Sequence, residues 1–137
     1  MSNCIFCKII NNEVPSYTVY EDDKTRAFLD IFPSAPGHVM VILKKHGDTV
    51  LDYASRELSD LMTTTQKVVG ALERVYDTKT LTIGINHGEP SGVPHLHIHI
   101  IPRTPADAGG VIQSIVKREG KDTIQKECEK IKIEIKN

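Results

Sequence analysis

Three histidines occupy alternate positions in a short apolar segment of this chain, His95-Leu96-His97-Ile98-His99-Ile100-Ile101. Because side chains on a β-strand alternate between its two faces, the three imidazoles share one face and the intervening apolar side chains point into the core. A neutral imidazole has one nitrogen with a lone pair, which can attack phosphorus or bind a metal ion. The pattern therefore predicts a functional site and leaves nucleophilic chemistry and metal binding as alternatives.

Two of the three cysteines form a Cys4-x-x-Cys7 pair near the N-terminus. This spacing lets two thiolates reach one metal ion, and two unreactive thiols on a short helix are the alternative. An odd number of cysteines is not typical of a disulfide framework and favours a reducing compartment. The first residues also lack a basic segment followed by an apolar one, so we expect no secretion signal and a cytoplasmic location.

The composition is that of an ordinary globular domain: 137 residues, 39% hydrophobic and 26% charged, with a formal net charge of −1. A net charge so close to zero argues against broad electrostatic binding to nucleic acid or to an anionic membrane. No apolar run approaches the length of about 18 residues that a membrane span needs. We expect neither nucleic acid nor a membrane as a partner, and any phosphate must be bound by a local site.

The histidine segment is the last of five predicted strands. Alternating polarity predicts a hairpin over residues 17–21 and 25–30, and further strands over 38–43, 81–86 and 95–101. Residues 4–11 are interpreted as a short helix. A 3.6-residue apolar period from Leu58 to Tyr76 predicts a long amphipathic helix with Ser55 as its N-cap. This order of elements favours an antiparallel α+β domain.

The chain changes character after Pro102. Residues 104–110 are typical of a linker, and beyond them an apolar stripe predicts a second amphipathic helix. The stripe consists of Ile124, Cys128, Ile131 and Ile135. Asp122 and Gln125 resemble a capping box at the start of this helix. We interpret both helical stripes as surfaces that pack in the core, and we divide the chain into a domain of residues 1–105 and a C-terminal extension of residues 106–137.

The surroundings of the histidines resemble the histidine-triad family of nucleotide hydrolases and transferases, and within it the bacterial and archaeal relatives of the Hint branch. The resemblance covers residue 1 to about residue 105. It is carried by the alternating histidines followed by Pro102-Arg103, and by Cys4-Ile5-Phe6-Cys7-Lys8-Ile9-Ile10, Ala27-Phe28-Leu29-Asp30, Gly37-His38, Lys44-Lys45-His46 and Asn86-x-Gly88. It implies a five-stranded antiparallel sheet with one long and one short helix, to which this chain adds its C-terminal helical tail. It also implies a homodimer whose sheets join edge to edge around the long helix.

The resemblance assigns a reaction to the histidines. It implies hydrolysis of a bond to the α-phosphate of a nucleotide, with AMP phosphoramidates as typical substrates, through a covalent nucleotidyl-histidine intermediate. His97 matches the nucleophile, held by a backbone carbonyl of its own strand. His99 matches the histidine that donates to the phosphate oxygens or assists the leaving group, and His38 matches a fourth histidine that supports the triad from the neighbouring strand.

The resemblance also implies a purine nucleotide site. Asp30 matches the acidic residue that accepts hydrogen bonds from the ribose hydroxyls, and Asn86 matches an amide that contacts the phosphate. The apolar residues that match those enclosing the base are Ile5, Phe6, Ile9, Phe28, Leu29 and Ile31. Taken alone, each of these apolar residues is better explained as part of the core.

One loop departs from the family pattern. The segment from Asn86 to His95 is two residues shorter, and Pro90-Ser91-Gly92-Val93-Pro94 stands where the family has a Gly-Gln pair followed by a small polar residue. Because the missing residues help to bind the phosphate and the leaving group, this departure bears on substrate preference. Ser91 is the candidate replacement.

The resemblance also completes a metal site. Bacterial relatives combine the two cysteines with the histidines that match His46 and His95, which implies a structural zinc ion held by Cys4, Cys7, His46 and His95. Four protein ligands would close the site to a substrate and leave the chemistry to His97.

Two further functions stay open. One is a dinucleoside polyphosphate hydrolase or nucleotidyl transferase of the same superfamily. The other is a nucleotide-binding sensor in which the shortened loop has weakened catalysis.

Overall fold

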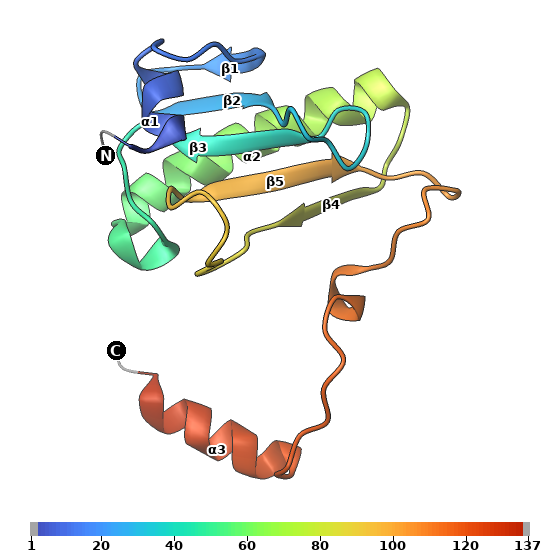
Figure 1. The fold of residues 1–137 in the computed structure, drawn as a ribbon. Coiled ribbons are helices and arrows are strands. Elements are labelled where there is room, and N and C mark those ends of the chain that lie inside the picture. Colours follow the sequence, from blue (N-terminus) through green and yellow to red (C-terminus); the bar gives the residue numbers. More distant parts are fainter. Residues whose placement is uncertain (1–2, 136–137) are drawn as a thin grey trace.

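The computed structural model describes residues 3–135 and contains a five-stranded antiparallel sheet with the strand order β1-β2-β3-β5-β4 (Figure 1). The strands are β1 (Thr18–Glu21), β2 (Thr25–Leu29), β3 (Val39–Leu43), β4 (Leu81–Gly84) and β5 (His97–Pro102). The helices are α1 (Ile5–Ile10), α2 (Ser55–Tyr76) and α3 (Ile124–Glu134), with short 3-10 turns η1 (Val50–Asp52) and η2 (Ile112–Ser114). The predicted α+β class, the antiparallel sheet and the order of its elements are confirmed.

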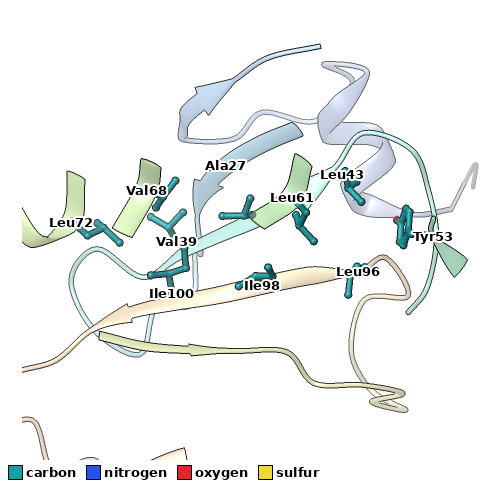
Figure 2. Close-up of a cluster of buried hydrophobic side chains, with 11 residues drawn as sticks. Ala27, Val39, Leu43, Tyr53, Leu61, Val68, Leu72, Leu96, Ile98 and Ile100 are labelled. Atoms are coloured by element: carbon teal, nitrogen blue, oxygen red, sulfur yellow. The ribbon is translucent and has the colours of Figure 1, made fainter. Parts of the chain in front are cut away.

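The main core lies between α2 and one face of the sheet (Figure 2). Alternate residues of the two central strands point into it, including the apolar spacers of the histidine segment, as predicted. This cluster consists of Ala27, Val39, Val41, Leu43, Tyr53, Leu61, Val68, Leu72, Leu96, Ile98 and Ile100. The alternation forces the side chains between them, His97 and His99, onto the opposite face.

That opposite face is covered in part by α1. Phe6 and Ile9 of this helix pack on Phe28, Met40 and Ile42 of the sheet in a second, smaller cluster. The buried Arg26 of β2 holds the C-terminal end of α1, because its Nη1 donates to the carbonyl of Ile9 at 2.7 Å. Carbonyls at a helix end lack partners within the helix, so this bond satisfies one of them and fixes α1 above the sheet.

Two predicted strand ends differ from those observed. β5 begins at His97 rather than at residue 95, because its register with β3 ends at the pair Ile42↔His97. β4 ends at Gly84, so Asn86 lies beyond the strand. His95 and Asn86 are therefore held by loop contacts rather than by the strand ladder.

Both predicted helix caps are displaced by one residue. Ser55 is the first residue of α2, and the backbone N–H of the N-cap residue Ala54 donates to the carboxylate of Glu57 at 2.8 Å. Thr123 caps α3, with its hydroxyl oxygen accepting from Lys126 N at 3.3 Å. Asp122 instead pairs with Lys130.

The C-terminal extension leaves the sheet beyond β4 and ends in α3, which stands apart from the domain (Figure 1). The predicted helix is present, but every residue from 111 to 135 is exposed, so the expectation that its stripe packs in the core of this chain is wrong. Between residues 3 and 135 no helix combines the length and the apolar character that crossing a membrane requires.

Candidate functional site

A cavity of about 630 Å³ opens on the face of the sheet that carries α1. Its size falls in the range of about 300–1,000 Å³ that is usual for small-molecule sites. The structure brings together nearly all of the predicted nucleotide-site residues here: Ile5, Phe6, Ile9, Phe28, Leu29, Asp30, Ile31, Asn86, Ser91, His97 and His99 line it. His38 lies behind His99, and the side chain of His95 lies elsewhere, with the two N-terminal cysteines.

His97 is held in one orientation by its own strand. Its Nδ1 lies 2.7 Å from the carbonyl oxygen of His95, and because a carbonyl can only accept, Nδ1 carries the proton and donates it. The other nitrogen, Nε2, therefore has the free lone pair. The Phe6 ring packs edge-on against the imidazole, with centroids 5.1 Å apart and an interplanar angle of 88°. The His97 ring is thus fixed in the tautomer that a nucleophile needs.

A chain of two hydrogen bonds fixes the opposite tautomer in His99. The backbone N–H of Ser34 donates to Nδ1 of His38 at 3.0 Å, so the proton of His38 lies on Nε2. This Nε2–H donates to Nδ1 of His99 at 2.8 Å, which leaves the proton of His99 on Nε2. His97 and His99 are therefore complementary, since one has a free lone pair and the other a free N–H donor.

Burial favours the neutral forms of these supporting histidines. Desolvation lowers the pKa of His38, although the nearby Asp30 carboxylate opposes the shift. Desolvation also lowers the pKa of His99, and the neighbouring His97 and His38 rings add to the shift. Both side chains are consequently neutral at pH 7 and act as hydrogen-bonding groups rather than as cations.

Asp30 follows β2 and brings a carboxylate to the cavity. Its Oδ1 accepts from the backbone N–H of Phe32 at 2.9 Å, and its Oδ2 lies 3.6 Å from Nε2 of His38. Its own backbone N–H donates to the His38 carbonyl at 2.9 Å. A carboxylate held in this way presents acceptor capacity to a ligand that carries hydroxyl groups.

The apolar wall of the cavity has a buried part and an open rim. Phe6 and Phe28 are only 5% and 2% exposed and pack edge to face with centroids 5.4 Å apart. Ile5 and Ile31 are 40% and 66% exposed and lie at the rim. Phe6 and Phe28 thus belong to the core and to the cavity wall at the same time. The two interpretations of these apolar residues, as core and as the enclosure of a base, are therefore compatible.

Sequence reasoning missed eight lining residues, among them Met40, Phe32 and Glu89. Met40 lies opposite His99 in the register of β3 and β5 and faces the cavity. Its position two residues after His38 is a period-two signal that could have found it. Phe32, which is 84% exposed, and Glu89 also line the cavity, but they lie in loops whose sequence carries no such signal.

The predicted metal ligands come together at the N-terminal end of α1. One ligand atom each from Cys4, Cys7, His46 and His95 lies within 4.8 Å of all the others. His95 donates from Nε2 to the Leu43 carbonyl at 2.8 Å, so the lone pair on its Nδ1 faces the sulfurs of Cys4 and Cys7 at 3.5 and 3.6 Å. The four side chains converge although three separate segments supply them.

The chemistry of this donor set fits zinc. His46 donates from Nε2 to the Asp48 carboxylate at 3.1 Å, which leaves its Nδ1 lone pair 3.3 Å from the Cys7 sulfur. Burial lowers the pKa of His95 to about 4, so this ring is neutral at pH 7 and could serve as a ligand. Burial and the neighbouring Cys4 raise the pKa of the Cys7 thiol, and a bound cation would reverse that shift. Two thiols and two imidazole lone pairs, each ring fixed by a second hydrogen bond, are a typical zinc set.

The chain belongs to the HIT family, whose domain model matches residues 11–106. Adenosine 5'-monophosphoramidase HNT1 of Saccharomyces cerevisiae is 36% identical over 110 residues, which cover 80% of this chain and 68% of that protein. Bis(5'-nucleosyl)-tetraphosphatase [asymmetrical] of Schizosaccharomyces pombe is 38% identical over 112 residues, covering 78% and 62%. The crystal structure of a HIT family member from Bacillus subtilis matches with a TM-score of 0.85 and 31% identity over 98% of this chain and 99% of that one. The resemblance expected from the histidine segment is therefore confirmed.

Proposed function

We propose that this protein is a hydrolase that cleaves the bond between the α-phosphate of a purine nucleotide and its leaving group, with AMP phosphoramidates as the first substrates to test. One observation carries the proposal: the bond from His97 Nδ1 to the His95 carbonyl leaves a lone pair on Nε2 in a cavity that also holds the N–H of His99. The relative named as an adenosine 5'-monophosphoramidase supports the substrate class.

The reaction would proceed in two displacements at phosphorus. Nε2 of His97 attacks the α-phosphorus, an N–P bond forms, and the bond to the leaving amine breaks as that amine takes up a proton from the solvent. Water then attacks the same phosphorus and loses a proton to the solvent, the N–P bond breaks, and the nucleoside monophosphate and free His97 are released. Nδ1 of His97 keeps its proton, donated to the His95 carbonyl, throughout, and the Nε2–H of His99 donates to the phosphate oxygens, where negative charge develops.

The other groups in the cavity would hold the nucleotide. The carboxylate of Asp30 would accept from the ribose hydroxyls, and the base would lie against the buried Phe28 and the exposed Ile31. Asn86 and Ser91 would contact the phosphate or the leaving group from the shortened loop, where both side chains are exposed.

Rapid quenching with an AMP amide labelled in the α-phosphate tests the proposal. We expect a transient label on His97. The His97→Ala variant should lose turnover by many orders of magnitude while it still binds AMP, because the binding groups are untouched. Label on His95 or His99, or near-normal turnover by His97→Ala, would contradict the assignment.

Dinucleoside polyphosphates are a second candidate substrate class, because one relative is named a bis(5'-nucleosyl)-tetraphosphatase. Comparing kcat/KM for an AMP amide with that for diadenosine tetraphosphate separates a phosphoramidase from a dinucleoside polyphosphate hydrolase. A nucleotidyl transferase would instead pass the labelled nucleotide to an acceptor other than water. Tight binding of AMP with no turnover of any of these substrates would identify the protein as a nucleotide sensor.

We also propose a structural zinc ion held by Cys4, Cys7, His46 and His95. A reducing compartment such as the cytoplasm would keep both cysteines as thiols able to bind it. Zinc bound there would tie the start of α1 to the sheet and would have no open position for a substrate. Elemental analysis of protein purified without chelator should find about one zinc ion per chain, as four protein ligands require.

We further propose that the protein is a homodimer. β4 is an edge strand with an open hydrogen-bonding side, and Ile83 within it and Ile85 just after it are 43% and 41% exposed. The apolar stripe of α3, an eleven-residue helix, also needs a surface to cover it, since so short a helix is marginal in water. Sedimentation at micromolar concentration should show twice the chain mass, and a single 15.3 kDa species would contradict the proposal.

A further inference from the structure

We propose that the cluster of Cys4, Cys7, His46 and His95 positions the nucleophile: the cluster holds the ring of His95, and the main-chain carbonyl of His95 holds His97. His95 is then a positioning residue that joins the metal site to the reaction site. This inference rests on the zinc site and on the role of His97 proposed above.

The ring of His95 is held in one orientation by hydrogen bonds and by ring packing. It is fully buried, donates from Nε2 to Leu43 at 2.8 Å and directs Nδ1 towards the two cysteine sulfurs. The Phe6 and His46 rings pack edge-on against it, with centroids 5.9 and 5.0 Å away. A change in the cluster therefore reaches the backbone of His95 directly.

The backbone at His95 lies outside the strand ladder, and its N–H donates to the carbonyl of Val93 in the preceding loop at 2.8 Å. It lies two residues before the start of β5, after an irregular and mostly exposed loop. The next residue, Leu96, donates its N–H to the Gly47 carbonyl at 2.8 Å, and Gly47 directly follows the ligand His46. Both the side chain of His95 and the backbone beside it thus contact one segment, residues 46–47, which is held by the cluster at His46 and by the Tyr53 hydroxyl, which donates to the Gly47 carbonyl at 3.1 Å.

The His95 carbonyl in turn decides the tautomer of His97. The bond of 2.7 Å from Nδ1 is the contact that keeps the proton off Nε2. If the peptide of His95 turns away, His97 is free to take the other tautomer or to rotate, and fewer molecules carry the attacking lone pair. A misplacement of about 1 Å at a reacting group costs about 10²-fold in rate, which sets the expected loss in kcat.

Two variants and one control test this coupling. His46→Ala removes a ligand from the segment before Gly47, whereas Cys7→Ser removes one from α1. Cys128→Ser is the control, because Cys128 is an exposed thiol on α3, far from the cluster. Nitrogen-15 NMR of the His97 ring, assigned by the signals that His97→Ala lacks, reports the tautomer independently of activity.

We expect wild type and Cys128→Ser to show His97 protonated on Nδ1 alone. His46→Ala and Cys7→Ser should show a mixture of tautomers and a kcat lower by up to about 10²-fold. KM should stay nearly constant in His46→Ala, because that change leaves the nucleotide-binding side chains in place. If a variant does not fold, chelation of the wild type followed by return of zinc gives the same comparison, with circular dichroism as the check on folding.

A folded, zinc-stripped protein that keeps the Nδ1–H tautomer and its kcat would overturn the coupling. A protein that holds no zinc and takes up none would also overturn it, together with the zinc site, but would leave the hydrolase proposal standing. Label that forms on a residue other than His97 would overturn the hydrolase mechanism instead. The three results are distinguishable because each has its own readout.

Discussion

Replacing His38 with asparagine should weaken catalysis by removing the proton donor that fixes His99. His38 accepts from Ser34 N–H at Nδ1 and donates from Nε2 to His99 Nδ1, at 3.0 and 2.8 Å. An asparagine side chain ends near the position of Nδ1 and does not reach that of Nε2, so the bond to His99 is lost. A glutamine side chain is longer and can keep a donor near Nε2, which makes His38→Gln the matched control.

The size of the effect follows from the burial of this contact. His38 is 4% exposed, so its loss leaves a poorly hydrated acceptor on His99. Such a loss costs about 1–3 kcal/mol. If the whole cost falls on the transition state, kcat/KM for an AMP amide decreases about 5- to 150-fold. His99→Ala removes the donor to the phosphate itself and should cost about 10²–10⁴-fold.

A double-mutant cycle measured by steady-state kinetics provides the assay. If His38 acts only through His99, the variant that combines His38→Asn with His99→Ala is no slower than His99→Ala alone. Thermal unfolding of each variant checks that the fold is kept. Losses that add in the double variant, or a folded His38→Asn with unchanged kcat/KM, would refute the tautomer chain.

Three further predictions concern stability and binding. Free zinc at 100 times its dissociation constant should add about 2.7 kcal/mol to the free energy of unfolding, and an unfolding midpoint that chelation leaves unchanged would contradict this. In zinc-free protein, stability should fall as the pH drops from about 6.5 towards 4, because burial lowers the pKa of His95 to about 4 and the unfolded chain takes up the proton first. The loss should reach about 3 kcal/mol in urea titrations, and a flat profile would count against it. Phe28→Ala should raise KM and cost about 3–5 kcal/mol of stability, since this ring is 2% exposed, whereas Ile31→Ala at the exposed rim should raise KM alone.

The period-two pattern of the histidine segment predicted the face of each side chain correctly. Leu96, Ile98 and Ile100 lie in the core with α2, and His97 and His99 line the cavity. The same rule applied from His38 would have found Met40. The pattern did not predict where β5 begins, because the alternation of histidines continues back to His95 whereas the pairing with β3 does not. Ile42, opposite His97, is the last residue of β3 that pairs with β5, and the chain then turns into the segment that contains His46.

Long-range partners were beyond the reach of the pattern. From the alternating pattern, Arg26 is expected on the exposed face of its strand. In the structure it is buried, and its guanidinium donates to the carbonyl of Ile9 at the end of α1, seventeen residues away in sequence. The stripe of α3 indicated a helix with an apolar side but not which surface covers it. An amphipathic period describes the helix itself, and its partner depends on where the connecting chain delivers it.

Three histidines of one strand pattern differ in chemistry because their main-chain surroundings differ. A neutral imidazole carries its proton on either Nδ1 or Nε2, and the spacing of residues 95, 97 and 99 does not determine which nitrogen carries it in each ring. The Leu43 carbonyl accepts from Nε2 of His95 and leaves the lone pair on Nδ1, the atom proposed to bind zinc, whereas the His95 carbonyl accepts from Nδ1 of His97 and leaves the lone pair on Nε2, the proposed nucleophile. His99 meets a donor, His38, in place of an acceptor, so its own proton stays on Nε2, from which we propose that it donates to a phosphate oxygen. Each tautomer is set by a neighbour that can only accept or only donate a hydrogen bond. The site therefore depends on the positions of the Leu43 and His95 carbonyls and of the Ser34 N–H, which fixes His38, as much as on the histidines themselves.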